Sequence, residues 1–321
     1  MNIKHDYPFD PTSGMTEKDL LAIPPPSIPE GFEEFWRNLY KETTAEECRY
    51  TVEEELWSPE KDTRIYRISF THDNGIRIGA WVTVPKTFTS AILVGHGYGH
   101  VPTARDALRK GFLTIHPCLR GLGLSQQKDI PWEVEHHAVY GIHSPETYVL
   151  TGCVKDFWMA AGVLLKMFPE VKGKLHYDGI SLGGGLGMLL LPWDDRIGAS
   201  AIDIPTLAGQ YQFNFPARSG SLSEIRKKYA LAHPEVKEVF TLFDAASAAG
   251  FLRKKVLITP ALFDPVNPPP VQFIIANSIP EEYRILRIRE TGHFTPTEKD
   301  LLQEKELEEL KEKLFTDEVV G

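Results

Sequence analysis

The part of this sequence that most restricts its fold is a serine between two glycines, set between an apolar run and a helical one. Residues 179–183 read Gly-Ile-Ser-Leu-Gly and match the pattern G-x-S-x-G. The preceding KLHYD predicts a strand, and the following LGMLLL predicts a helix. In such a strand–turn–helix the turn pushes the serine hydroxyl away from the backbone, and the glycines avoid the neighbouring strand and helix. A chance match in a chain this long has a probability of roughly one in ten, so the strand and helix around the serine carry most of the weight.

The rest of the chain predicts an α/β architecture. From residue 90 onward short apolar runs alternate with helical patterns, which is typical of a mostly parallel sheet flanked by helices. Before that, RIYRISFTH and IRIGAWVTV alternate polar and apolar residues around Asp-Asn-Gly and predict a hairpin. The proline-rich start predicts an N-terminal arm and lead-in helix over residues 1–40, followed by one domain over 41–321. Helices and loops over about 205–250 predict an insertion before the penultimate strand, at the carboxyl ends of the strands, where such sheets bind ligands.

Composition excludes several classes of partner. The formal charge of −9 and the absence of a long Lys/Arg-rich stretch argue against binding to nucleic acid or an anionic membrane surface. No apolar run approaches the ~18 residues that span a bilayer, and the start lacks the apolar core of a signal peptide. Cys48, Cys118 and Cys153 are odd in number and far apart, so they predict neither a disulfide framework nor a zinc site. We expect a soluble, cytoplasmic protein with a small, neutral or weakly charged substrate.

A serine hydroxyl needs a histidine to accept its proton and a carboxylate to orient that histidine. On a strand–turn–helix site the chain order is serine, then acid, then histidine. Two histidines follow Ser181: His233 lies in the inserted segment before a proline, and His293 lies between the last predicted strand and the last helix. The order favours His293 as the general base and a structural role for His233.

Two aspartates compete for the place of the acid. Asp264 ends the apolar run VLITPALFD, and Asp203 ends ASAIDIP one strand earlier. We favour Asp264, because a loop after the penultimate strand lies beside the His293 loop in this topology. Asp178, next to the serine turn, is interpreted as strand-end structure.

An acyl-transfer site also needs backbone amides that face the developing oxyanion. One comes from the residue after the serine, and the other from a loop after an early strand, here HGYG at residues 96–99. We therefore predict the amides of Leu182 and Tyr98 as donors and Tyr98 as a wall of the substrate site, with His96 orienting its loop by hydrogen bonds. Arg120, in RGLG, is predicted either to contact substrate or, the favoured alternative, to brace its loop. The stretch after it, the long loop over residues 125–144, has little periodicity, which is typical of a functional loop.

Two other patterns could point to different chemistry. His136, His137 and His143 lack the spacing of a recognisable metal site, so they are interpreted as polar residues on the rim of the long loop. The glycine run 183–185 lacks the lysine of a phosphate-binding loop and is interpreted as allowing close helix–sheet packing. We expect no metal and no cofactor.

Taken together, HGYG, RGLG, GISLGGGLG, DIP, LAHPEV, LFDPVNPPPVQFIIAN and ETGHF, in this order, resemble the acetyl xylan esterase and cephalosporin C deacetylase family of α/β hydrolases. The resemblance covers roughly residues 32–315. It implies the α/β-hydrolase fold, with Ser181 as nucleophile, Asp264 as acid, His293 as base, and the amides of Tyr98 and Leu182 as oxyanion donors. It also implies removal of small acyl groups, chiefly acetyl, from sugars and related esters by a metal-free, cytoplasmic homo-oligomer, often a hexamer.

The chain departs from the family at two positions. Leu182 stands where the family commonly has glutamine, and Cys118 where it commonly has aspartate. We predict a serine carboxylesterase acting on small acyl esters. The alternatives are a serine peptidase of the same fold, which would normally carry a large accessory domain, an esterase for longer acyl chains, and an inactive hydrolase that acts as a binding protein.

Overall fold

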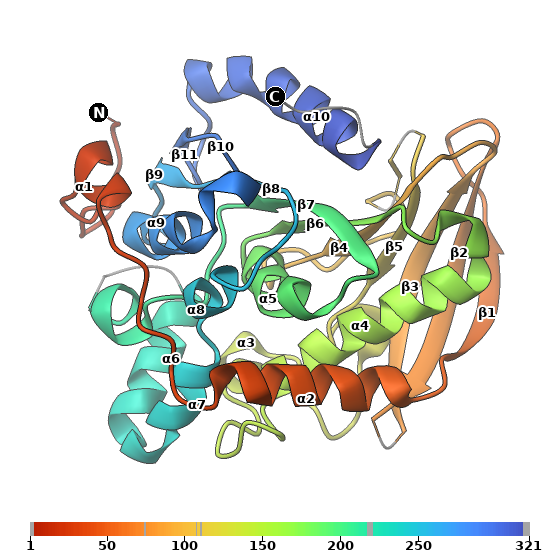
Figure 1. Ribbon diagram of the computed structural model, residues 1–321, viewed down its shortest axis with the longest axis horizontal. Coiled ribbons are helices and arrows are strands. Elements are labelled where there is room, and N and C mark those ends of the chain that lie inside the picture. Colours follow the sequence, from red (N-terminus) through yellow and green to blue (C-terminus); the bar gives the residue numbers. More distant parts are fainter. Residues whose placement is uncertain (1–2, 74, 107, 110, 217–220, 317–321) are drawn as a thin grey trace.

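A sheet of nine strands, in the order β1-β2-β3-β5-β4-β6-β7-β8-β10, runs through the middle of the molecule (Figure 1). The computed structural model describes residues 3–73, 75–106, 108–109, 111–216 and 221–316. The strands of this sheet are β1 (Arg49–Leu56), β2 (Thr63–His72), β3 (Ile76–Pro85), β4 (Ala91–Gly95), β5 (Leu113–Pro117), β6 (Leu175–Ile180), β7 (Ile197–Asp203), β8 (Val256–Thr259) and β10 (Arg284–Leu286). From β1 to β5 the neighbours pair antiparallel, and the expected hairpin is the β2–β3 pair. From β5 onward all neighbours pair parallel, which confirms the predicted sheet.

Helices cover both faces of the sheet, as predicted (Figure 1). In strand β4 the side chain of Leu93 joins the large core that includes helix α4, while its neighbour Ile92 packs with Phe315 of α10 on the opposite face. This alternation is the period of two of a strand with both faces buried. The longer helices are α2 (Phe32–Ala45), α4 (Val149–Met167), α5 (Leu182–Leu190), α6 (Ser221–Ala232), α9 (Pro269–Ser278) and α10 (Glu298–Phe315). No helix in the described ranges is long and apolar enough to cross a bilayer.

The remaining elements are short. They are α1 (Glu17–Leu21), α3 (Val134–His137), α7 (Lys237–Leu242), α8 (Ala245–Ala249), a π-helix η4 (Gln210–Asn214), and the 3-10 turns η1 (Gly123–Ser125), η2 (Pro169–Val171), η3 (Leu191–Trp193), η5 (Pro234–Val236) and η6 (Glu281–Tyr283). The inserted segment between β7 and β8 is made of η4, α6, η5, α7 and α8. It follows the carboxyl end of β7, at the edge of the sheet where the serine turn also lies.

Two runs that the sequence predicts as single strands are each divided in the structure. VLITPALFD forms β8 and then β9 (Ala261–Phe263), and YRILRIRE forms β10 and then β11 (Arg289–Thr291). The break in the first run falls at Pro260, which has no backbone N–H to donate to a ladder. β9 and β11 leave the main sheet and pair parallel with each other, with Phe263 opposite Thr291. The segments that follow β9 and β11 therefore begin side by side.

The N-terminal arm returns to the same edge. The backbone N–H of Asp264 donates to the carbonyl of Pro11 at 3.1 Å. The ring of Tyr7 lies 6.1 Å from that of Phe294, the residue after His293. Asn277 of α9 donates to the carbonyls of Leu20 and Ile23 at 3.0 and 2.9 Å. These contacts fasten the arm over the loops that follow β9 and β11.

Candidate active site

Ser181 lies in a strained turn between β6 and α5. Its backbone angles are φ 56° and ψ −118°. Residues other than glycine rarely adopt this conformation, and the strain costs on the order of 1–3 kcal/mol. The turn is held by hydrogen bonds: Ser181 N–H donates to the carbonyl of Asp203 at 2.9 Å, and Gly185 N–H donates to the carbonyl of Ser181 at 3.0 Å. The strain leaves the hydroxyl at the helix N-terminus, clear of the strand.

The glycines around the serine allow close approach of backbone to backbone. A methyl group at Gly183 would lie 2.3 Å from the carbonyl oxygen of Gly95, and one at Gly185 would lie 2.4 Å from the carbonyl oxygen of Thr206. A methyl group at Gly179 would lie 2.8 Å from the carbonyl oxygen of Gly183. The close packing predicted for these glycines is therefore what the structure shows.

Ser181, His293 and Asp264 form one hydrogen-bonded series. His293 Nε2 lies 3.0 Å from Ser181 Oγ, and His293 Nδ1 lies 2.8 and 3.1 Å from Asp264 Oδ2 and Oδ1. These distances suit a proton on Nδ1 that is donated to the carboxylate, which leaves Nε2 free to accept the serine proton. The structure brings together the three residues that the chain order singles out.

The Asp264 carboxylate is buried and held by neutral groups. Oδ1 accepts from the backbone N–H groups of Val266 and Asn267 at 2.8 and 2.9 Å, and Oδ2 accepts from Gln272 Nε2 at 2.9 Å. A methyl group at Gly292, the residue before His293, would lie 2.1 Å from Oδ2. The loop that carries His293 therefore approaches the Asp264 carboxylate as closely as glycine allows. Several donors thus fix the carboxylate without a cation.

The competing aspartates have other partners. Asp203 Oδ2 accepts from Lys311 Nζ at 2.6 Å, and Oδ1 accepts from the Thr259 hydroxyl at 2.5 Å. Burial by itself raises the pKa of the Asp203 carboxyl, but the Lys311 ammonium and these hydrogen bonds outweigh it and hold the pKa below its usual range. Asp178 pairs with Arg109 and lies 3.5 Å from Lys311 Nζ. Both aspartates therefore belong to an ion-pair cluster with α10.

His233 has surroundings unlike those of His293. Its ring stacks on Tyr229, with centroids 4.4 Å apart, and its Nδ1 lies 3.1 Å from Glu235. His143 meets the same cluster, with its Nε2 2.9 Å from the Tyr229 hydroxyl. These contacts join the long loop to α6 and give His233 a structural setting.

The loop after β4 passes close to Ser181. A methyl group at Gly97 would lie 3.6 Å from both Leu182 N and Ser181 Cβ, in ordinary contact. Tyr98 follows directly, and burial raises the pKa of its phenol well above the usual range. The loop after β4 thus runs beside Ser181 and the backbone N–H of Leu182.

Two buried histidines tie this loop to the long loop. His96 Nδ1 lies 2.9 Å from the Gly97 carbonyl, while its Nε2 accepts from Leu119 N–H at 2.9 Å. His137 Nε2 lies 2.7 Å from the Arg120 carbonyl, and its Nδ1 lies 2.6 Å from the Tyr98 hydroxyl. Burial lowers the pKa of His96 to about 4 and also lowers the pKa of His137, so both rings are neutral near pH 7. A neutral ring serves as donor on one side and acceptor on the other, as both positions require.

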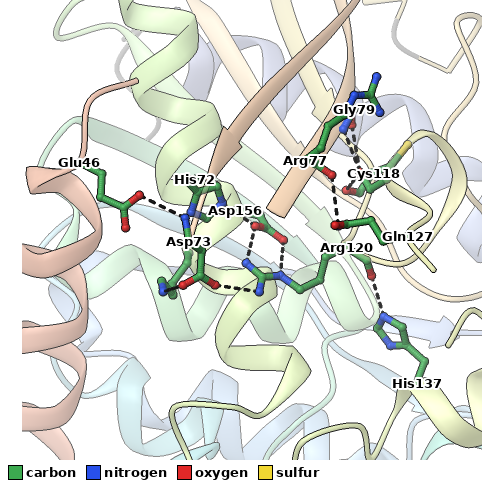
Figure 2. Close-up of polar contacts among 12 residues, drawn as sticks. Glu46, His72, Asp73, Arg77, Gly79, Cys118, Arg120, Gln127, His137 and Asp156 are labelled. Carbon is green, nitrogen blue, oxygen red and sulfur yellow. Dashed lines mark hydrogen bonds and ion pairs between the residues drawn. The ribbon is translucent and has the colours of Figure 1, made fainter. Parts of the chain in front are cut away.

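Arg120 points into a buried charge cluster on α4, and Figure 2 shows its guanidinium between two carboxylates. Nε and Nη2 donate to Asp156 at 2.9 and 2.7 Å, and Nη1 donates to Asp73 at 3.0 Å. His72 Nε2 lies 2.7 Å from Asp156 on the other side, and Lys155 pairs with Asp73. Every nitrogen of the guanidinium is engaged, so these contacts do not support substrate binding by Arg120, and they fit the bracing alternative.

Asn267 is the residue near the nucleophile that the sequence did not single out. It lies in the run DPVNPPP after the acid, and its Nδ2 is 3.3 Å from Ser181 Oγ. Nothing in residue type or spacing marks it, because asparagine in a proline-rich turn is ordinary turn chemistry.

The histidines of the long loop were predicted as polar rim residues, and for His137 this prediction is wrong, because its side chain is fully buried. Within the described ranges, no group of three or more His, Cys, Asp or Glu side chains could hold a metal ion.

The mostly parallel sheet, the strained serine turn and the hydrogen-bonded Ser–His–Asp series define a serine hydrolase with the α/β-hydrolase fold. The match to a family model then makes the assignment more specific. The model described as acetyl xylan esterase (AXE1) matches residues 23–307. The chain therefore belongs to the acetyl xylan esterase family, whose members are serine esterases of small acyl esters.

Solved structures agree on the fold. An acetyl xylan esterase from Paenibacillus sp. R4 superposes with a TM-score of 0.81 at 20% identity, covering 94% of this chain and 100% of that one. Acetyl xylan esterase 1 from Thermoanaerobacterium sp. JW/SL YS485 gives 0.79 at 22% identity, covering 95% and 99%. An acylaminoacyl peptidase from Pyrococcus horikoshii gives 0.61 at 12% identity, covering 81% of this chain but 49% of that one. No curated protein sequence matches.

Proposed function

We propose that this esterase hydrolyses acetyl esters of sugars or similar small molecules through an acyl-enzyme on Ser181. His293 takes the serine proton at Nε2 as Oγ attacks the ester carbonyl, and Asp264 stabilises the imidazolium that forms. The observation that supports these roles most is the pair of hydrogen bonds from His293, 3.0 Å to Ser181 Oγ and 2.8 Å to Asp264 Oδ2.

The tetrahedral intermediate carries a negative oxygen that needs donors. We propose the backbone N–H of Leu182, at the start of α5, and a second amide from the loop at 96–98, predicted as that of Tyr98. The start of a helix offers an unpaired N–H and the positive end of the helix dipole. The closeness of the loop to this amide supports the arrangement, since a methyl group added at Gly97 would lie 3.6 Å from Leu182 N.

The alcohol then leaves with the proton from His293, which becomes neutral again. A water molecule gives its proton to the same nitrogen and attacks the acyl carbonyl, and the acid product departs as Oγ regains its proton. All proton transfers in this cycle pass through one nitrogen of one side chain.

The substrate, the cellular setting and the assembly are part of the same proposal. The family resemblance supports an acetylated sugar, or the acetyl ester of a cephalosporin, as substrate. The apolar Leu182 beside the nucleophile is the position at which selectivity would differ from that of its relatives. Three free cysteines, two of them buried, support a reducing, cytoplasmic setting. The resemblance also supports a homo-oligomer, a hexamer being the expected size, which light scattering in solution would measure.

Ser181→Ala tests the nucleophile. We expect hydrolysis of p-nitrophenyl acetate to fall by about 10⁴-fold or more, with an unchanged fold by circular dichroism. Parental activity in this variant would refute the assignment, and a wild-type enzyme that a fluorophosphonate probe fails to label on Ser181 would favour the inactive-hydrolase alternative. A p-nitrophenyl ester series from acetate to octanoate is expected to peak at acetate, and a peak at longer chains would identify the longer-acyl alternative.

A further inference from the structure

The side-chain amide of Asn267 meets the nucleophile directly. Its Nδ2 lies 3.3 Å from Ser181 Oγ and 2.9 Å from the carbonyl oxygen of Ile204. The residue is only 3% exposed. A primary amide nitrogen carries two hydrogens, so one can be donated to each oxygen.

The orientation of this amide is fixed by its surroundings. If the amide were reversed, its Oδ1 would face the Ile204 carbonyl oxygen, and two acceptors would meet without a proton between them. Ile204 itself is held at φ 39°, an unusual conformation for a β-branched residue. The carbonyl that selects the orientation of Asn267 is therefore part of a constrained turn.

The backbone of Asn267 is fixed by the acid that orients the base. Its N–H donates to Asp264 Oδ1 at 2.9 Å, and its carbonyl accepts from Gln272 Nε2 at 2.7 Å. The same Gln272 nitrogen donates to Asp264 Oδ2 at 2.9 Å. One carboxylate thus positions two side chains, His293 and Asn267, that meet on the same serine oxygen.

We propose that Asn267 is a fourth catalytic residue, which donates a hydrogen bond to Ser181 Oγ throughout the reaction. A serine hydroxyl has one proton and two lone pairs. The proton goes to His293 Nε2, one lone pair accepts from Asn267, and the other attacks the ester carbonyl. The inference rests on the proposed function, because it assigns Asn267 a part in the same acyl transfer.

The donated bond acts where charge develops. As the proton moves to Nε2 in acylation, electron density builds on Oγ and the bond from Asn267 strengthens. In deacylation the bond between Oγ and the acyl carbon breaks, its electron pair goes to Oγ, and Oγ takes the proton back from Nε2. A donor that is stronger in the transition state than in the ground state accelerates both steps.

Asn267→Ala and Asn277→Ala form a matched pair for the test. Asn277, on helix α9, likewise donates to two oxygens through Nδ2, but both are backbone carbonyl oxygens of the arm, those of Leu20 and Ile23. For Asn267→Ala we expect kcat with p-nitrophenyl acetate to fall about 10- to 100-fold, with KM within about twofold of the parent. For Asn277→Ala we expect parental kcat per active site and a lower melting temperature.

Activity is expressed per site titrated with a fluorophosphonate, so that partial unfolding does not imitate a catalytic loss. Asn267→Asp keeps the size of the side chain but removes the N–H donor, and we expect a loss at least as large as that of alanine. A kcat within twofold of the parent in Asn267→Ala, or an equal loss in Asn277→Ala, would overturn the inference. The proposed function fails separately, if Ser181→Ala keeps its activity whatever the result at Asn267.

Discussion

Two buried aspartates, Asp203 and Asp264, stand at the ends of strands, and their carboxylates differ in what they bind. One is paired with a cation, and the other is held by neutral donors. Asp203 ends β7 and pairs with Lys311 of α10, with its other oxygen on the Thr259 hydroxyl. Asp264 follows β9, and its donors among the described residues are uncharged amide N–H groups and the His293 imidazole. Their exposed fractions are similar, 8% and 1%, so burial does not distinguish them.

The difference lies in what compensates the negative charge. A carboxylate with a lysine 2.6 Å away is already neutralised, and an imidazolium would gain little from it. A carboxylate held by neutral donors keeps its field available for a positive charge that forms beside it during the reaction. We infer that Asp203 contributes to folding and Asp264 to chemistry, and the experiments below are designed to separate these roles.

The largest effect is expected for Asp264→Asn. The amide has the same size, but it leaves His293 with no carboxylate and favours the wrong tautomer, so kcat is expected to fall by about 10⁴-fold. The measurement is kcat per folded molecule with p-nitrophenyl acetate. If activity fell less than tenfold, Asp264 would not be the triad acid.

Asp203→Asn is expected to act on stability. Lys311 would remain buried without its nearest partner and would keep only the longer contacts to Asp178 at 3.5 Å and Glu308 at 3.7 Å. Breaking a buried pair typically costs about 3–5 kcal/mol, and these remaining carboxylates place the expected loss at or below the lower end, while the folded fraction should keep kcat within a few-fold of the parent. Urea unfolding measures the first quantity and kinetics at low temperature the second. The double variant Asp203→Leu with Lys311→Met is expected to regain much of the stability, since it removes both charges. A loss of kcat as large as that of Asp264→Asn would end the distinction between the two carboxylates.

Gly292→Ala tests how tightly the acid is held. The new methyl group would lie 2.1 Å from Asp264 Oδ2, so the carboxylate or the base loop must move. A displacement of this size is expected to lower kcat by about 10- to 100-fold. Gly250→Ala is the control, because a methyl group there would meet only the Ser247 carbonyl oxygen, at 3.7 Å. Equal activity of the two variants would show that the acid tolerates movement.

The smallest effect is the pH dependence of stability. The pKa of Asp203 is lower in the folded protein than in the unfolded chain, so the stabilisation from this group is present above the unfolded pKa, near 3.9. It is lost as the pH falls through the folded-state pKa. Asp156 and Asp73 behave alike, because neighbouring cations outweigh burial and hold the pKa of each carboxyl below its usual range. The cation is Arg120 for Asp156, and Lys155 together with Arg120 for Asp73. The buried histidines His96 and His137 have a folded-state pKa below the value of about 6.5 in the unfolded chain, so the unfolded chain takes up more protons as the pH falls. We therefore expect the free energy of unfolding to be nearly constant from about pH 7 to 8, to decline below about pH 6.5 through the histidines, and to decline further below about pH 4 through the aspartates. The fall should be shallower in Asp203→Asn, and an identical slope would show that the ion pair adds nothing.

The sequence by itself determined the serine turn, the type of sheet and the order of the candidate residues. The turn follows from sterics over five residues, because positions 179 and 183, two residues before and after Ser181, leave no room for a Cβ beside neighbouring backbone. The alternation of apolar runs and helical patterns predicted a mostly parallel sheet, and His293 was favoured because it lies between the last predicted strand and the last helix. These are local properties, and neighbouring residues carry them.

Only the tertiary structure decided which partner each charged or polar group meets. After the breaks in their runs, β9 and β11 lie outside the main sheet and pair with each other, and this places Asp264 beside His293. Lys311, 108 residues after Asp203 in the chain, is the cation that pairs with Asp203 and makes its surroundings unlike those of Asp264. Asp156 likewise pairs with Arg120, from a distant part of the chain. Asn267 reaches Ser181 across 86 residues of sequence. Residue type and spacing specify what a side chain can bind, but the partner is set by packing between distant segments, since hydrogen bonds and ion pairs act over only a few ångströms.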